Sequence, residues 1–277
     1  MKTILTDKEL EKLSYGYRKR ALEMALKAGG GHLAPAFSAQ DIVTLLYRDF
    51  LNVDPKNPQW PDRDRFILSK GHACLALYTV LADLGFFPKE ALDTFTQPGG
   101  FLGGHSDRTV PGVEVNTGSL GHGLPLAVGM AFARNIDKKA FRVVTVLSDG
   151  ECQEGSTWEA AQFAGHHKLE HMLAIVDYNK FQSLGRVADI LSLEPFADRW
   201  KSFGWSVQEA DGHDFSSLRN ALKKFPFEKS RPSVIIAHTV KGKGVSFMEN
   251  KPIWHYRNPN KEELPIAMAE LAAKCGG

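Results

Sequence analysis

The stretch FRVVTVLSDGECQEGSTWEAAQFAGHHKLEHMLAIVDYNKF, residues 141–181, decides the fold of this chain. Its first seven residues form a short apolar, β-branched run that predicts a strand, and residues from about 157 to 167 predict a helix. A second apolar run at 172–177 predicts the next strand. Apolar strands that alternate with helices are typical of a parallel sheet with both faces covered.

The flanking sequence extends the same pattern on both sides. Thr6 and Glu9 resemble a capping box that opens a helix ending at Gly29. Ser38 with Asp41 predicts the start of a second helix that runs to about Tyr47. Further helices are expected at about 74–84, after an Asp214 cap, and at about 261–274, with strands at 205–209 and 233–239. We expect an α/β fold, a mostly parallel β-sheet flanked by helices on both faces, in a single domain over residues 1–277.

The composition indicates which partners and which cellular compartment to expect. A formal net charge of +2 on 277 residues gives no reason to expect nucleic acid or an anionic membrane as the main partner. The three cysteines are far apart in the sequence, as in proteins of a reducing compartment. No signal-peptide core and no long uncharged apolar run is visible. We therefore expect a cytoplasmic protein.

Two polar residues follow successive predicted strands. Asp149-Gly150 comes directly after the first strand, and Asn179 follows the second. Ligands of open parallel sheets gather beyond the carboxyl ends of the strands, so the two side chains can converge there. Carboxylate and carboxamide oxygens suit Mg²⁺ or Ca²⁺, and Gly150 lets a phosphate approach the backbone at the start of a helix. The spacing alone is equally compatible with a strand-end turn and an unrelated loop asparagine.

The resemblance to a known family favours the metal site. Asp-Gly followed after about thirty positions by Asn resembles the signature of thiamine diphosphate enzymes. EGSTWEAA, VDYNKF, RDRFILSKGH and NTGSLGHGLPLAVGMA resemble the transketolase form of it. The resemblance implies the diphosphate-binding (PP) domain of the thiamine diphosphate fold, with thiamine diphosphate and Mg²⁺ as cofactors, Ca²⁺ or Mn²⁺ being possible substitutes. By this likeness Asp149, Asn179 and the carbonyl of Phe181 bind the metal, Gly150 contacts the diphosphate, and Gly118 and Leu120 line the cofactor ring.

Four histidines match positions of the transketolase site. They stand in GGGHLAP (His32), SKGHACL (His72), GGHSDR (His105) and KPIWHY (His255). The resemblance implies that His72 contacts the diphosphate, that His255 reaches diphosphate and substrate, and that His32 and His105 bind hydroxyls of the ketose donor. Imidazoles suit this work because they donate or accept protons near pH 7.

The resemblance covers only the N-terminal part of a transketolase. The glutamate that activates the cofactor lies, in the family, in a separate pyrimidine-binding domain, and only about twenty residues follow His255. We expect one subunit of a split transketolase that needs a C-terminal subunit carrying that domain, in an α2β2 heterotetramer acting on sugar phosphates. The reaction would move a two-carbon ketol unit from a ketose to an aldose.

Other interpretations remain open at this stage. The chain could belong to another thiamine enzyme, of the deoxyxylulose-phosphate synthase or 2-oxo acid dehydrogenase type, or to a non-catalytic module of the same fold. His167 and His171 match an HxxEH zinc-peptidase pattern, although the following strand indicates that their helix is ending. Lys241-Gly242-Lys243-Gly244 could hold phosphate, but a solvated loop is the default expectation. Glu154 and Glu159 match glutamates near the family's dimer interface and equally suit a solvated first helical turn.

Overall fold

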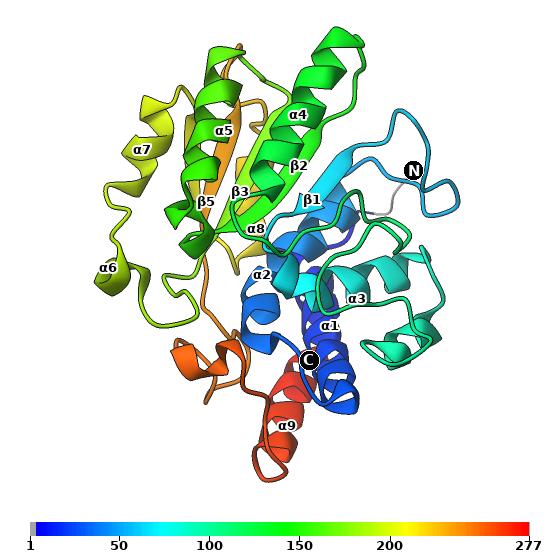
Figure 1. The fold of residues 1–277 in the computed structure, drawn as a ribbon. Helices are drawn as coiled ribbons and strands as arrows, with labels where there is room; N and C mark the ends of the chain where they lie inside the picture. The colour runs from blue at the N-terminus through cyan, green and yellow to red at the C-terminus, as the bar shows by residue number, and fades with distance from the viewer. Residues whose placement is uncertain (1–3, 277) are drawn as a thin grey trace.

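A five-stranded parallel sheet runs through the centre of the computed structural model, which describes residues 4–276 (Figure 1). The strands are β1 (Arg65–Leu68), β2 (Val143–Ser148), β3 (Met172–Tyr178), β4 (Ser206–Asp211) and β5 (Ser233–His238), in the spatial order β1-β2-β3-β5-β4. Every neighbouring pair is parallel. The expectation of a parallel sheet is confirmed, and the four predicted strands match β2 to β5 within two residues at each end.

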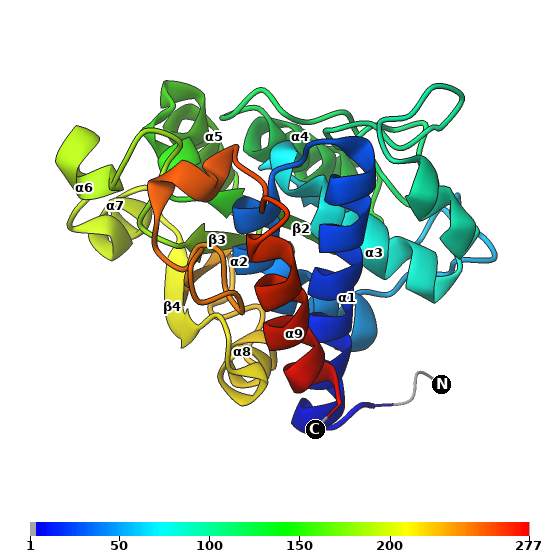
Figure 2. The ribbon, with the colours of Figure 1, turned by 90° about the horizontal axis from the view of Figure 1, so that it is seen from below.

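Helices cover both faces of the sheet. They are α1 (Asp7–Ala28), α2 (Leu33–Leu45), α3 (Cys74–Leu84), α4 (Gly123–Ile136), α5 (Gly155–His166), α6 (Val187–Ile190), α7 (Phe196–Ser202), α8 (Phe215–Leu222) and α9 (Glu263–Cys275). Shorter 3₁₀ or π turns are η1 (Leu46–Phe50), η2 (Gly71–Ala73), η3 (Lys89–Thr94), η4 (Gly150–Gln153) and η5 (Pro252–His255). Figure 1 shows α4, α5 and α7 on one face, and Figure 2, seen from below, shows α1, α2, α8 and α9.

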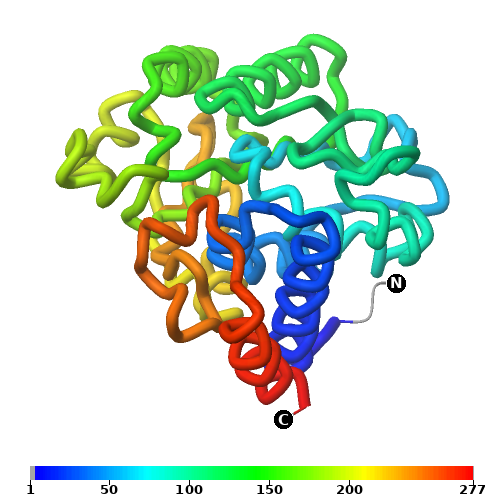
Figure 3. The backbone as a smooth tube through the Cα atoms, turned by 60° about the horizontal axis from the view of Figure 1, so that its bottom comes forward, coloured from blue at the N-terminus to red at the C-terminus, as the bar shows by residue number. Residues whose placement is uncertain are grey.

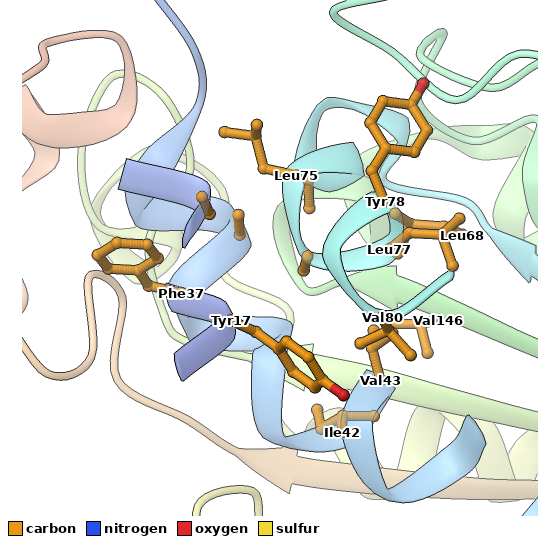
Figure 4. Close-up of a cluster of buried hydrophobic side chains, with 14 of the residues drawn as sticks. Tyr17, Phe37, Ile42, Val43, Leu68, Leu75, Leu77, Tyr78, Val80 and Val146 are labelled. Atoms are coloured by element: carbon orange, nitrogen blue, oxygen red, sulfur yellow. The ribbon is translucent and has the colours of Figure 1, made fainter. Parts of the chain in front are cut away.

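Alternate residues of the strands belong to two separate hydrophobic cores, one on each face of the sheet. Val144 and Val146 of β2 pack with α1, α2 and α3, whereas Val143 and Leu147 pack with α4, α5 and α7. Figure 4 shows the first core, in which Phe37 and Val43 of α2 and Leu77 of α3 gather beside β1 and β2. Because side chains alternate along a strand, a fully apolar strand such as β2 must be covered on both sides.

The first helix is terminated as the sequence predicts. Thr6 and Glu9 form both hydrogen bonds of a capping box, and Gly29 ends α1 in a left-handed conformation with φ of 72°. The last helix, α9, runs beside α1 at the edge of the molecule (Figures 2 and 3). No helix within residues 4–276 combines the length and the apolar character needed to cross a bilayer.

The predicted start of the second helix is wrong. α2 begins at Leu33, directly after His32, and not at Ser38. Ser38 donates to the carbonyl of Pro35 and to Asp177, and Asp41 pairs with Arg18, so neither residue caps a helix end. Their side chains are buried in mid-helix, where a polar residue needs a tertiary partner.

Two elements carry no clear signal in the sequence. β1 has only four residues between charged segments, and its pairing with β2 supplies the hydrogen bonds that define it. α4 contains Gly123, Pro125 and Gly129, which lower the intrinsic helix propensity of the segment. Packing of Leu124, Ala127 and Val128 against the second core therefore stabilises a helix that local preference does not indicate.

Replacing two helical glycines by alanine should change the stability of the protein in opposite directions. A Cβ on Gly165 of α5 would lie 1.9 Å from the carbonyl oxygen of Phe203, whereas a Cβ on Gly129 of α4 meets nothing within 4 Å. We expect Gly165→Ala to lower the free energy of unfolding by about 1–3 kcal/mol because the backbone must shift. Gly129→Ala should raise it by about 0.5–1 kcal/mol. Urea denaturation of the two variants measures both changes, and a Gly165→Ala protein as stable as wild type would contradict this packing.

Candidate active site

A pocket of about 390 Å³ lies beyond the carboxyl ends of the central strands. Nine of the ten predicted site residues line it: His32, His72, His105, Gly118, Leu120, Gly150, Asn179, Phe181 and His255. The tenth, Asp149, is fully buried directly beside Gly150. The structure therefore brings together residues that are up to 223 positions apart (255 − 32).

The Asp149 and Asn179 side chains both accept from backbone N–H groups of the turn that follows β3. Ser148 pairs with Asp177 in the register of β2 and β3, so both strands end at the same level. The Asp149 carboxylate accepts from the backbone N–H of Gly150 at 2.8 Å and from that of Lys180 at 2.6 Å. Asn179 Oδ1 accepts from the N–H of Phe181 at 3.0 Å. The predicted convergence of the two side chains is thus a property of the fold.

The oxygen atoms of this turn fit a hard divalent cation. Burial, and then the nearby Asp177 carboxylate, raise the pKa of Asp149 to about 7, although the hydrogen bonds from the N–H groups of Gly150 and Lys180 lower it. A bound cation would favour the charged carboxylate. One carboxylate, one carboxamide and one carbonyl are few ligands, which is typical of Mg²⁺ sites that use phosphate oxygens as well.

An ion pair between Lys70 and Asp177 forms the floor of the pocket. Both side chains are at most 1% exposed. Asp177 also accepts hydrogen bonds from the hydroxyls of Ser38 and Thr239, and Lys70 donates to the carbonyl of Pro35 at 3.1 Å. Burial alone would raise the pKa of Asp177, but Lys70 and the two hydroxyls hold it below its usual value. Lys70 is not among the predicted site residues, although it stands in the quoted stretch RDRFILSKGH, because only the structure shows that its side chain is buried beside Asp177.

Lys241 is a second buried cation at the pocket. It is only 1% exposed, so the expectation of a solvated loop is wrong for this residue. Its ammonium donates to the carbonyl of Gln182 at 2.9 Å and to His255 Nδ1 at 2.8 Å. Burial, and then repulsion by Lys70, lower the pKa of Lys241 to about 7. An anionic ligand would favour the charged ammonium.

The four predicted histidines form one cluster. Ring centroids are 5.5 Å apart for His32 and His72, 5.8 Å for His32 and His105, 5.7 Å for His32 and His255, and 5.4 Å for His72 and His255. Burial is the main reason why the pKa values of His32, His72 and His255 are lowered, that of His255 to about 3. These three imidazoles are therefore neutral near pH 7 and can each donate and accept one hydrogen bond.

Neighbouring elements hold the loops that carry this cluster. The Tyr78 hydroxyl of α3 donates to the carbonyl of His105 at 2.7 Å. A Cβ on Gly118 would lie 2.7 Å from the His105 ring, so the close approach of these two loops requires glycine there. The buried Glu151 carboxylate accepts from Ser69 Oγ and from the N–H of Gly121 at 3.0 Å. Glu151 thereby ties the loop of Gly118 and Leu120 to the end of β1.

The zinc-peptidase interpretation does not fit the structure. It requires both histidines on one continuing helix, but α5 ends at His166. The His167 ring packs against Phe163 and Phe132 at centroid distances of 4.2 and 4.8 Å. In the described part of the chain, no three His, Cys, Asp or Glu side chains are arranged to hold a metal ion, and the Asp149 turn uses a different set of oxygens.

A larger hollow of about 810 Å³ lies elsewhere, between α1, α3 and η3. None of the ten predicted site residues lines it. Several charged side chains at its rim are paired with one another, as in Arg20 with Asp93 at 2.8 Å and Lys89 with Asp83 at 2.5 Å. The chemistry of the molecule is therefore concentrated in the smaller pocket.

Comparison with known proteins reveals relatives over almost the whole chain. The family described as "Transketolase, thiamine diphosphate binding domain" matches residues 12–268. The 6-deoxy-6-sulfo-D-fructose transketolase subunit of Clostridium sp. (strain MSTE9) is 44% identical over 92% of this chain and 93% of its own length. An apulose-4-phosphate transketolase subunit of Phocaeicola vulgatus is 40% identical over 96% of this chain and 94% of its own length.

Other matched proteins are much longer than this chain. The transketolase of Rattus norvegicus is 37% identical over 91% of this chain but only 40% of its own length. Among solved structures, transketolase from Leishmania mexicana superposes with a TM-score of 0.89 at 28% identity, covering 99% of this chain and 42% of that one. The chain is thus similar to less than half of these transketolases and to nearly all of the two proteins named as subunits.

The buried ion pair under the pocket yields a stability prediction. Asp177→Asn leaves the Lys70 ammonium without its carboxylate in a dry site, so the free energy of unfolding should fall by about 3–5 kcal/mol. Asp198→Asn is the matched control, because the Asp198 pair with Lys201 is exposed and should contribute less than about 1 kcal/mol. Chemical denaturation measures both variants. Equal, small losses in the two would contradict the role assigned to the buried pair.

Proposed function

This chain belongs to the transketolase family, and we propose that it is the N-terminal, diphosphate-binding subunit of a transketolase built from two different chains. The observation that carries the proposal is the pocket itself, where the Asp149 turn, two buried lysines and four histidines face one space. Residues 1–277 act in this proposal as one PP-type domain, because a single sheet contributes to both hydrophobic cores.

Asp149, Asn179 and the carbonyl of Phe181 would hold Mg²⁺, for which Ca²⁺ or Mn²⁺ could substitute. The supporting observation is a buried carboxylate whose pKa of about 7 would be lowered by a cation. The diphosphate of the cofactor would lie against Gly150, His72 and His255, where the Lys241 ammonium offsets its negative charge. Gly118 and Leu120 would line the cofactor ring, since the loop that carries them forms one wall of the pocket.

The histidines would act on the sugar. The chemistry that thiamine diphosphate supplies when bound is stabilisation of a carbanion, by which a two-carbon ketol unit passes from a ketose phosphate to an aldose. His32 and His105 would hydrogen-bond the hydroxyl groups of the donor, and His255 would reach both donor and diphosphate. Neutral imidazoles can accept a proton from a sugar hydroxyl and return it, and burial keeps His32 and His255 neutral near pH 7.

A second chain would complete the site. Support comes from the two relatives named as subunits, which this chain matches over at least 93% of their length, whereas it spans 40% of the transketolase of Rattus norvegicus. We propose a C-terminal subunit that carries the pyrimidine-binding domain, in an α2β2 heterotetramer located in the cytoplasm. Glu154, directly before α5, and Glu159, within it, are exposed and are available to that interface.

The alternative of another thiamine enzyme is not favoured. The matched family and the relatives above are transketolases, and not synthases of deoxyxylulose phosphate or components of a 2-oxo acid dehydrogenase. A non-catalytic module is not favoured either, since a fold kept only for binding would have no need of four clustered imidazoles.

Reconstitution tests the proposed function. The chain purified alone, with thiamine diphosphate and Mg²⁺, should transfer no ketol unit, because the cofactor ring lacks its activating glutamate. Adding a separately purified C-terminal transketolase subunit should restore turnover, measured by a coupled aldose-release assay over a panel of ketose phosphates. Full turnover by the chain alone would contradict the two-chain proposal.

A further inference from the structure

His213 lies outside the pocket, in the turn between β4 and α8. Gly212 precedes it, and a Cβ on Gly212 would lie 2.3 Å from Thr239 Cγ2, so this turn packs tightly against the end of β5. The N–H of Gly212 donates to the carbonyl of His238 at 2.8 Å. The His213 side chain is only 10% exposed. Its ring is therefore held beside the segment by which the chain leaves β5.

Both ring nitrogens of His213 have buried partners. The backbone N–H of Val240 donates to Nε2 at 2.8 Å, and Nδ1 lies 2.6 Å from Asp41 Oδ2. A backbone N–H can only donate, so Nε2 must carry its lone pair. The proton is then on Nδ1, where it is donated to the carboxylate. The two contacts together select one neutral tautomer.

Asp41 is a fixed acceptor in this arrangement. Burial would raise the pKa of Asp41, but Arg18 reverses the effect through two hydrogen bonds of 2.8 and 2.7 Å and holds the pKa below its usual value. Ser14 also donates to the same carboxylate. Arg18, Asp41 and a neutral imidazole sum to no net charge, whereas a protonated His213 would leave a net positive charge among these three side chains.

The segment after Val240 carries Lys241. The carbonyl of Lys241 accepts from the N–H of Asn250 at 2.9 Å, and the N–H of Gly242 donates to the carbonyl of Ala34 at 3.1 Å. With the contact from His213 to the N–H of Val240, the backbone of three successive residues is held by hydrogen bonds to other segments. Lys241 in turn donates to His255 Nδ1, which leaves Nε2 as the proton-bearing nitrogen of His255.

We propose that His213, oriented by Asp41, is a positioning residue that sets Lys241 and the tautomer of His255 for the diphosphate ligand. The role rests on the proposed function, since Lys241 and His255 are the groups that would face the diphosphate. His213 itself does not line the pocket. It acts through the N–H of Val240, the residue directly before Lys241.

The first test measures the tautomer of His213, and this measurement does not depend on cofactor binding. Two-bond ¹⁵N–¹H correlation spectra of the full chain labelled with [¹⁵N]histidine distinguish a protonated from an unprotonated ring nitrogen. At pH 7 we expect His213 to carry its proton on Nδ1 and a lone pair on Nε2. The opposite tautomer, or a doubly protonated ring, would overturn the proposal.

The second test uses a matched pair of variants in the assembled two-chain complex. The amide of His213→Gln reaches the position of Nε2 and can accept from Val240, whereas the amide of His213→Asn reaches only the position of Nδ1. Titration calorimetry with thiamine diphosphate and Mg²⁺ should give a Kd raised about tenfold or more for His213→Asn and less than about threefold for His213→Gln. His238→Leu is the control, since the pair of His238 with Glu209 at the same sheet edge is exposed.

The outcomes distinguish a failure of the positioning role of His213 from a failure of the proposed function. A general loss of packing would lower the melting temperature and raise the Kd of both variants alike, which would overturn a positioning role through Val240. A wild-type Kd in His213→Asn would overturn it as well. Absence of thiamine diphosphate binding by the wild-type complex would instead overturn the proposed function, and with it the role of His213.

Discussion

The buried ion pair of Lys70 and Asp177 is the contact on which the pocket depends. Asp177 lies near the end of β3, at the centre of the sheet. It accepts from three different segments: Ser38 in α2, Lys70 after β1, and Thr239 after β5. These segments also carry His32, His72 and Lys241. A buried carboxylate that lost one donor would be strongly destabilised, so the three segments are held at one point. The approach of His32 to His72 is consistent with this common anchor.

Two charged groups near that anchor have only neutral hydrogen-bond partners within residues 4–276. Asp149 accepts from backbone N–H groups, and Lys241 donates to a carbonyl and an imidazole. Both pKa values are shifted to about 7, in the direction that removes the charge. A divalent cation at Asp149 and an anionic diphosphate between it and Lys241 would restore both charges. The pocket is thus complementary to a metal–diphosphate ligand.

How much the sequence predicts depends on whether local pattern or tertiary packing determines a feature. Asp149 and Asn179 follow two apolar runs, and adjacent parallel strands bring such residues together, so the convergence of this pair was predictable from the strands. The four histidines stand in separate loops and were assigned to the site only through the family resemblance. α1 was predictable from its capping box. α4 was not predictable, because its glycines and proline lower the local helix propensity and packing against the second core stabilises the helix. Lys241 was assigned to a solvated loop because its burial depends on the fold of the segment around it, including the contact from His213.

The central claim is that this chain anchors a diphosphate through a metal at Asp149. Calorimetric titration of the assembled complex with thiamine diphosphate, with Mg²⁺ and with a chelator, tests it most directly when wild type is compared with Asp149→Ala. We predict that wild type binds tightly only with Mg²⁺ and that Asp149→Ala loses the metal-dependent part of the affinity. An unchanged, metal-dependent affinity in Asp149→Ala would contradict the account.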